Sequence, residues 1–189
     1  MTDRSSPDQR LASYGLMQSV FPGFMKRYRD RLTPAACMVG DEFARDAGNY
    51  SSRIAPHSTV VHGDFRLDNL LFTASGRVGV VDFQTVTHAC GALDLAYFIG
   101  AGLDIDTRRA HERELVEQWV DGLGGYNVTL SVDEAWLEYR RFAFAGFMMA
   151  VIASMIVKQT ERGDDMFMAM ANRHAQHVAD LDALVVVRG

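Results

Sequence analysis

The sequence predicts a mostly helical α+β domain that contains one small β-hairpin. Helix-start signals recur along most of the chain, whereas short strand-like runs are confined to about residues 60–81. The 189 residues are 48% hydrophobic and 23% charged, which is the balance of one soluble domain with its own core. We expect residues 1–12 to form a disordered tail and residues 13–189 to form this single domain.

Capping signals predict the helices in the first two thirds of the chain. Thr33 as N-cap, with Pro34 at the first helical position, predicts a helix that runs to about Tyr50. Asp106 or Thr107 is expected to begin another helix, which ends near a glycine at position 122.

A capping box predicts the longest helix. Ser131 and Glu134 have the spacing at which each side chain can accept a free backbone N–H of the other residue. We expect this helix to end at Gly163, and a last helix to begin with Asp164 or Asp165 as its N-cap.

Residues 142–157 form an uncharged apolar segment, for which a membrane span and a core helix are the alternatives. About 20 apolar residues are needed to cross a bilayer, so this segment is too short. The length therefore predicts a buried core helix and no membrane contact.

Two short apolar runs, residues 70–72 and 78–81, are separated by turn-forming residues and predict a β-hairpin. The expected centre lies between Ser75 and Gly76, which is also midway between Asn69 and Asp82. Folding the hairpin should therefore bring these last two side chains together. Amide and carboxylate oxygens are ligands that Mg²⁺ accepts.

The order and spacing of Asp64, Asn69 and Asp82 indicate phosphoryl-transfer chemistry. In that chemistry one Asp accepts the proton of the attacking hydroxyl, while an Asn five residues later and a second Asp hold the Mg²⁺ that bridges the nucleotide phosphates. His62 is expected to pack and hydrogen-bond beneath the loop. Two roles are open for Arg66. It could stabilise charge on the transferred phosphoryl group, or it could form an ion pair with a neighbouring carboxylate such as Asp68.

Three segments carry a resemblance to a known family: HGDFRLDNLLF at residues 62–72, VVDFQ at 80–84 and GALDLA at 91–96. They resemble the aminoglycoside phosphotransferase and choline-kinase-like superfamily, which has a protein-kinase-like fold. The resemblance implies that Asp64 is the catalytic base and that Asp94 is a buried carboxylate bracing the loop through backbone N–H groups. It also implies Asn69 and Asp82 as ligands of Mg²⁺ with ATP or GTP. Gln84, where protein kinases have glycine, suits kinases of small-molecule hydroxyl substrates.

The segment before the motif lacks the nucleotide-covering parts of a kinase. Only 61 residues precede His62, and their glycines are not spaced as Gly-x-Gly. The two lysines cannot be the strand lysine that grips the phosphates, because Lys26 lies in a helical pattern and Lys158 follows the motif. We therefore expect a C-terminal lobe without its N-terminal lobe, which binds nucleotide poorly if at all and is inactive alone.

Two other functions remain open from the sequence. The chain could be a noncatalytic remnant or binding module, or a metal-dependent hydrolase that uses His62, Asp64 and Asp82. The expected partners are a small-molecule hydroxyl substrate and either a separate N-terminal lobe or a second copy of the chain, because a missing lobe would leave apolar surface exposed.

The net charge and the cysteine content bear on the binding partners and on the cellular compartment. The net charge of −5 disfavours nucleic-acid binding, which needs a basic surface. Cys37 and Cys90 are isolated, and with no signal-peptide pattern they favour a reducing cytoplasm. A set near the C-terminus, Arg173, His174 and His177, could contact an anion at the surface but is more often without a specific role.

Overall fold

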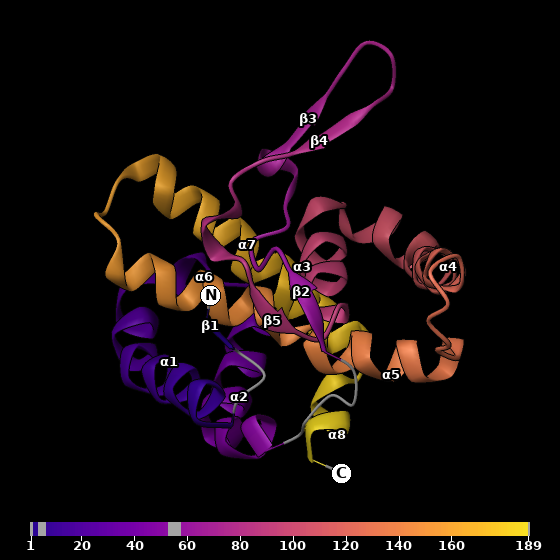
Figure 1. The fold of residues 1–189 in the computed structure, drawn as a ribbon. Helices are drawn as coiled ribbons and strands as arrows, with labels where there is room; N and C mark the ends of the chain where they lie inside the picture. Colours follow the sequence, from indigo (N-terminus) through magenta and orange to yellow (C-terminus); the bar gives the residue numbers. More distant parts are fainter. Residues whose placement is uncertain (1, 4–6, 53–57, 189) are drawn as a thin grey trace.

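The computed structural model describes residues 2–3, 7–52 and 58–188 (Figure 1). Helices make up most of these residues, and the strands are short, as expected for a mostly helical α+β domain. The expected disordered tail falls partly outside the described residues, namely at positions 1 and 4–6. Residues 7–12 of that segment form the first turns of helix α1.

The helices follow one another around a common core. Their bounds are α1 (Pro7–Tyr28), α2 (Pro34–Ser52), α3 (Ala92–Gly102), α4 (Ile105–Gly124), α5 (Val132–Phe142), α6 (Phe144–Ile156), α7 (Glu161–Asp180) and α8 (Ala183–Arg188). Helix α6 packs mainly on α7 and α1, and α2 packs on α1 and α7. Helix α3 contacts α5, α6 and α7, and lies beside strand β2 (Figure 1).

The capping signals place two helix starts correctly and a third within two residues. The Thr33 hydroxyl accepts a hydrogen bond from the Ala36 N–H at 3.2 Å, and α2 begins at Pro34 as predicted. The capping box of Ser131 and Glu134 is present at the start of α5. Helix α4 was expected to begin at Asp106 or Thr107, but its N-cap is Asp104. The Asp104 carboxylate accepts a hydrogen bond from the N–H of Thr107.

The prediction of one long helix ending at Gly163 is wrong. The helix is interrupted at Ala143, between α5 and α6, and α6 ends at Ile156. Gly163 lies in the first turn of α7, where its N–H donates to the Thr160 hydroxyl at 3.1 Å. Thr160 is therefore the N-cap of the following helix.

Asp164, one of the two expected N-caps of the last helix, has another role. Its carboxylate accepts hydrogen bonds from the Tyr28 hydroxyl at 2.6 Å and from Gln159 at 2.7 Å. Because it ties α7 to α1 and to the segment before α7, it is not available to cap the helix. The chain leaves α7 through Asp182, which has a φ of 47°, and then enters α8.

The predicted hairpin is confirmed. Strands β3 (Leu70–Phe72) and β4 (Val78–Val80) are antiparallel, with Leu70 opposite Val80 and Phe72 opposite Val78. This register centres the hairpin on Ser75, half a residue from the expected position. The strands project beyond the helical body, and their apolar side chains are exposed, with Phe72 reaching 67% (Figure 1).

A second, three-stranded sheet was not predicted. Strand β5 (Thr87–Ala89) lies between β1 (Thr2–Asp3), which it pairs with in parallel, and β2 (Thr59–Val61), which is antiparallel to it. The sheet fixes the end of β2, and the catalytic-type motif begins at the next residue. Its strands come from segments far apart in the sequence, so no turn between neighbouring apolar runs indicates their pairing.

The apolar segment at residues 142–157 packs in the core, as predicted. Phe144 and Phe147 of α6 are fully buried, and Phe144 stacks on Phe43 of α2 with ring centroids 4.9 Å apart. By length and composition alone, the stretch Val132–Ile156 could cross a membrane, but half of its most apolar window is buried inside the structure. Burial against α1, α2 and α7 accounts for its composition.

Candidate active site

A tight loop between β2 and β3 carries the residues expected to perform the chemistry. His62 and Gly63 directly follow β2, and the 3-10 turn η2 (Leu67–Asn69) leads into β3. Gly63 has a φ of +79°, in the left-handed region that residues with a Cβ avoid. A Cβ there would also lie 2.6 Å from the carbonyl oxygen of Thr85. The loop therefore needs glycine for two separate reasons.

Gly63→Ala is expected to lower the free energy of unfolding by about 1–3 kcal/mol through backbone strain, and by a further amount through the contact with Thr85. Gly76→Ala is the matched control, because Gly76 has a φ of +78° but no atom within 4 Å of an added Cβ. Urea unfolding followed by circular dichroism measures both losses. Equal losses in the two variants would mean that the close approach to Thr85 has no energetic weight.

Asp94, in the first turn of α3, holds the loop backbone. Its two carboxylate oxygens accept the N–H of His62 at 2.6 Å and the N–H of Gly63 at 2.9 Å. The residue is half-buried, so these charge-assisted bonds are only partly screened by solvent. On the other side of the loop, the Thr85 hydroxyl donates to the carbonyl of His62 at 2.8 Å. These bonds hold His62 and Gly63 from both sides.

His62 connects the loop to the base of the hairpin. Its ring is buried, its Nε2 lies 2.9 Å from the carbonyl oxygen of Val81, and its Nδ1 accepts the N–H of Asp64 at 3.3 Å. These partners assign the proton to Nε2. Both ring nitrogens are therefore occupied by the protein backbone, and Phe83 packs on the ring with centroids 5.0 Å apart.

Asp64 follows this anchored pair, and its carboxylate is held by three side chains. Tyr97 donates its hydroxyl to Oδ1 at 3.1 Å, and the Asn69 amide donates to Oδ2 at 3.1 Å. The same Asn69 amide donates to the carbonyl oxygen of Asp64 at 2.9 Å. Arg66 places its Nε 3.4 Å from Oδ2. The side chain of Asp64 remains 20% exposed, so one edge of a preoriented carboxylate faces solvent.

The hairpin brings the backbone of Asn69 close to the segment that precedes Asp82. The N–H of Val81 donates to the carbonyl oxygen of Asn69 at 3.0 Å, which puts Asp82 one residue beyond the paired position. Asp82 is exposed and has left-handed backbone angles, and its carboxylate accepts a long bond of 3.4 Å from Gln84. In the described part of the chain it makes no hydrogen bond with Asp64 or Asn69.

The donor atoms of this loop fit a hard cation better than a soft one. Asn69 uses its amide nitrogen for Asp64, which leaves its Oδ1 as an oxygen donor, and Asp82 offers an exposed carboxylate. Among the described residues, no three His, Cys, Asp or Glu side chains gather as a metal-binding group. The arrangement suits Mg²⁺, which takes few protein ligands and completes its shell with phosphate oxygens and water.

Arg66 is engaged with carboxylates in this structure. Besides Asp64, its guanidinium contacts Asp68 at 3.2 Å and the sulfur of Met166 at 3.5 Å. The ion-pair alternative is therefore present here. Asp68 is 74% exposed, and an ion pair with so exposed a partner is weak, so the guanidinium could exchange this partner for an anionic ligand at little cost.

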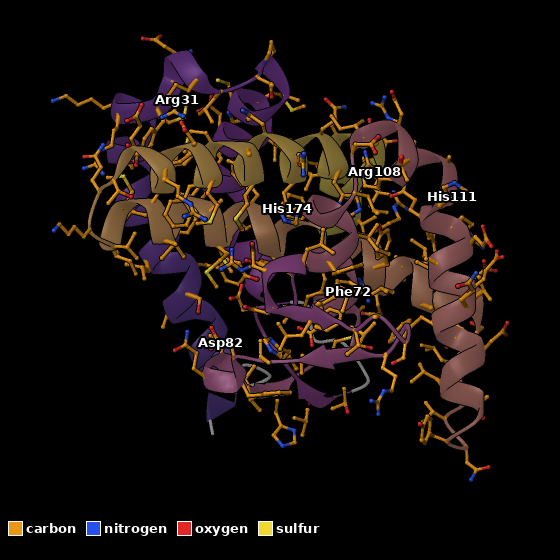
Figure 2. All side chains as sticks on the ribbon, turned by 90° about the horizontal axis from the view of Figure 1, so that it is seen from above. Arg31, Phe72, Asp82, Arg108, His111 and His174 are labelled. Carbon is orange, nitrogen blue, oxygen red and sulfur yellow. The ribbon has the colours of Figure 1, made fainter. Side chains whose placement is uncertain are left out.

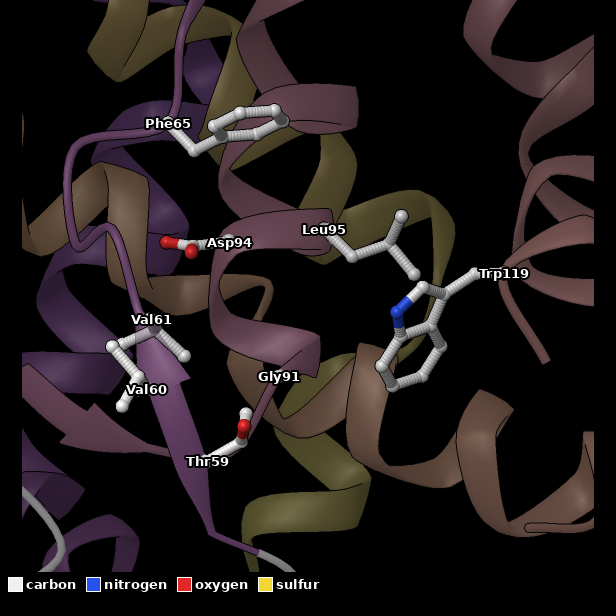
Figure 3. A pocket seen from close by; sticks show the side chains of 8 residues that line it. All are labelled: Thr59, Val60, Val61, Phe65, Gly91, Asp94, Leu95 and Trp119. Carbon is white, nitrogen blue, oxygen red and sulfur yellow. The ribbon is translucent and has the colours of Figure 1, made fainter. Parts of the chain in front are cut away.

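A hollow of about 260 Å³ lies behind the loop, between β2, α3 and α4 (Figure 3). Its lining is mainly apolar and consists of Thr59, Val60, Val61, Phe65, Gly91, Asp94, Leu95 and Trp119. Figure 3 shows the Asp94 carboxylate directed toward the loop and away from Trp119. Because Asp64 does not line this hollow, we place the chemistry on the other side of the loop.

The C-terminal set of Arg173, His174 and His177 is not a surface set. His174 and His177 are completely buried, and His174 lies in the interior between helices (Figure 2). Glycines make room for it, since a Cβ at Gly100 of α3 or Gly146 of α6 would collide with the imidazole. Arg173 remains at the surface and donates to the carbonyl of Ala101 at 2.8 Å. The prediction of a surface cluster is therefore wrong.

Burial determines how these histidines ionise. Desolvation, with the positive charges of His177 and Arg108 adding to it, lowers the pKa of His174 to about 3. Burial also lowers the pKa of His177, although a hydrogen bond with Glu112 acts in the opposite direction. Among the described residues, neither ring nitrogen of His174 has a hydrogen-bond partner. Both observations describe a neutral imidazole in the core.

A buried ion-pair network continues from His177. Its Nε2 lies 2.7 Å from the Tyr139 hydroxyl, which donates to Glu112 at 3.1 Å, and Arg108 contacts Glu112 at 2.9 Å. Arg108 is 1% exposed and also pairs with Asp180 (Figure 2). Burial alone would raise the pKa of Glu112, but the hydrogen bond with His177 and the charge of Arg108 hold it below its usual value.

Sequence comparison agrees with the geometry. Among proteins with curated functions, none shows significant similarity to this chain. The sequence model of the APH family, described as the phosphotransferase enzyme family, matches residues 8–140. This match spans most of the chain and includes the loop, the hairpin and Asp94. The chain therefore belongs to the phosphotransferase enzyme family.

Proposed function

We propose that the chain transfers a phosphoryl group from a nucleoside triphosphate to the hydroxyl of a small molecule. The observation that carries this proposal is the Asp64 carboxylate, oriented by Tyr97 and Asn69 at the open edge of a loop whose backbone is held by Asp94. A general base must be positioned before its proton affinity matters. Family membership supports the reaction class, and Gln84 in place of a kinase glycine supports a small-molecule acceptor.

Each residue then has a distinct task. Asp64 accepts the proton of the acceptor hydroxyl as that oxygen attacks phosphorus. Asn69, through Oδ1, and Asp82, through its carboxylate, would hold Mg²⁺. When bound, this ion neutralises charge on the nucleotide phosphates. Arg66 leaves Asp68 and stabilises the phosphoryl oxygens as charge develops on them. His62 and Asp94 keep the loop in place, and neither transfers a proton.

Turnover also requires a segment that covers the nucleotide. In the described ranges, the strands near the loop form only the small sheet and the projecting hairpin, and none provides a glycine-rich turn over the phosphates. We propose that a separate N-terminal lobe supplies this cover, and that the chain alone is inactive or nearly so. Positioning provides most of the rate in phosphoryl transfer, so an uncovered nucleotide reacts slowly.

The two alternatives differ in what the loop can bind. A metal-dependent hydrolase would need His62 as a ligand, but both of its ring nitrogens are engaged with backbone groups. No contact among the described residues favours this alternative. A noncatalytic remnant would keep the loop geometry without nucleotide affinity, so a binding experiment separates it from the phosphotransferase.

Addition of Mg²⁺ with ATP, or with GTP, to the ¹⁵N-labelled chain is expected to shift the amide signals of Asn69 and Asp82. Millimolar nucleotide is used, since affinity without a cover is expected to be weak. Asp82→Ala should weaken binding about 10-fold or more, as expected for the loss of one metal ligand. Asp165→Ala is the control, because Asp165 is 67% exposed and its ion pair with Arg31 is a surface contact. Absence of any shift at saturating nucleotide would favour the noncatalytic remnant.

A further inference from the structure

Tyr97 is the least exposed of the three described side chains that touch the Asp64 carboxylate. It is 4% exposed, whereas Arg66 keeps 29% of its side chain exposed. The Tyr97 hydroxyl donates to Oδ1 of Asp64 at 3.1 Å, while Asn69 and Arg66 both act on Oδ2. Tyr97 is thus the one described side chain that fixes Oδ1.

The position of Tyr97 is set from the core and not from the loop. Its ring lies against that of His174 of α7, with centroids 5.5 Å apart. His174 is itself held between Gly100 and Gly146, where there is no space for a side chain. The Tyr97 ring therefore rests on a rigid support, and the hydroxyl at its tip has little freedom to follow movements of the loop.

Tyr97 also shares a helix face with the residue that holds the loop backbone. Asp94 and Tyr97 are three residues apart on α3 and lie on the same side of the helix. Asp94 binds the N–H groups of His62 and Gly63, and Tyr97 binds the carboxylate of Asp64. Helix α3 therefore positions both the backbone and the side chain of three consecutive loop residues.

We infer that Tyr97 is a positioning residue for phosphoryl transfer, which keeps Oδ1 of Asp64 fixed so that the carboxylate presents one defined edge to the acceptor hydroxyl. This inference rests on the proposed function. A carboxylate held only through Oδ2 could rotate about its Cβ–Cγ bond, and the fraction of time in the productive orientation would fall. The Tyr97 hydroxyl transfers no proton in this scheme.

The contact is tested first without any assay of activity, by a double-mutant cycle on stability. Tyr97→Phe keeps the ring on His174 and removes only the hydroxyl. It is expected to lower the melting temperature by about 3–6 °C in the unaltered chain, as for one hydrogen bond to a charged group. In an Asp64→Ala background the same change should lower it by less than about 1 °C. Tyr126→Phe, at an 83% exposed tyrosine, should have no effect in either background.

The catalytic part is tested by separating kcat from KM for the nucleotide, with a nucleotide-covering lobe added to the chain. Tyr97→Phe should lower kcat about tenfold, as expected for loss of roughly 1.4 kcal/mol of orientation, and leave KM within about twofold. Equal melting shifts in the two backgrounds, or an unchanged kcat, would overturn the inference while leaving the phosphotransferase proposal intact. A different outcome is that the two residues are coupled in stability, but the chain transfers no phosphate even with a nucleotide-covering lobe added. That outcome would overturn the proposed function and the positioning role together.

Discussion

Asp64→Asn is expected to lower the rate of phosphoryl transfer about 10²- to 10⁴-fold, the usual contribution of a general base. The amide has nearly the shape of the carboxylate and can still accept a hydrogen bond from Tyr97, but it cannot accept the proton of the acceptor hydroxyl. The fold should persist, because Asp94 and His62 hold the loop backbone without Asp64. Nucleotide affinity should change by less than about threefold, since the proposed Mg²⁺ ligands are Asn69 and Asp82.

The measurement is transfer of the labelled γ-phosphate of ATP to a panel of amino alcohols and sugar alcohols, with the chain at high concentration and a nucleotide-covering lobe added. Asp165→Asn removes a carboxylate at the surface and should leave the rate unchanged. A variant of Asp64 that keeps the full rate would exclude this residue as the base. An unaltered chain that shows no transfer alone, and none with a nucleotide-covering lobe added, would support the noncatalytic remnant.

Acidification is expected to destabilise the fold well above the pH at which most carboxylates protonate. The pKa of His174 is about 3 in the folded chain, against about 6.5 for an unfolded histidine. Between these values the unfolded chain binds one more proton, so stability is complete above about pH 6.5 and is lost progressively as the pH falls toward 3. The slope is at most about 1.4 kcal/mol per pH unit, which gives roughly 3 kcal/mol by pH 4.

The neighbours of His174 determine the pH range in which this effect can be isolated. His177 has a lowered pKa as well, and adds to the loss in the same range. Glu112 and Asp180 have lowered pKa values, so their contribution is lost only below about pH 4.5, as they protonate. Arg108 stays charged throughout. Measurements between pH 4.5 and 7 therefore report mainly on the two histidines.

Urea unfolding of His174→Leu at a series of pH values would test this expectation. The variant keeps a side chain of similar volume and should show a shallower dependence of unfolding free energy on pH than the unaltered chain. His111→Leu is the control, because His111 is 57% exposed and contacts Glu114 at the surface. Identical slopes in the unaltered chain and in His174→Leu would show that the imidazole is protonated in the folded state.

The sequence predicted those parts of the site that depend on neighbours along the chain. The hairpin follows from two apolar runs and a turn between them, and its register agrees with the prediction within half a residue. The meeting of the Asn69 and Asp82 side chains at one metal ion stays a prediction. The Ser131 capping box was found for the same reason, since both partners lie within one helical turn. Local spacing was sufficient in each case.

Features that depend on packing between distant segments were missed. Nothing near His174 shows that Gly100 and Gly146 make room for it, so its burial could not be inferred. The interruption at Ala143 has no glycine or proline to mark it, and depends on how α5 and α6 pack on different neighbours. Tyr97 was also missed, although the sequence carries a signal for it. It follows Asp94 by three residues and therefore lies on the same face of the helix.

The two glycines beside His174 have an evolutionary consequence. A methyl group at position 100 or 146 cannot coexist with an imidazole at position 174, because the same volume would be filled twice. Homologous chains should therefore vary at these three places together, with alanine or larger residues entering α3 and α6 only where α7 carries a smaller side chain. A homologue in which only one of these three residues is replaced would need a different packing between the helices.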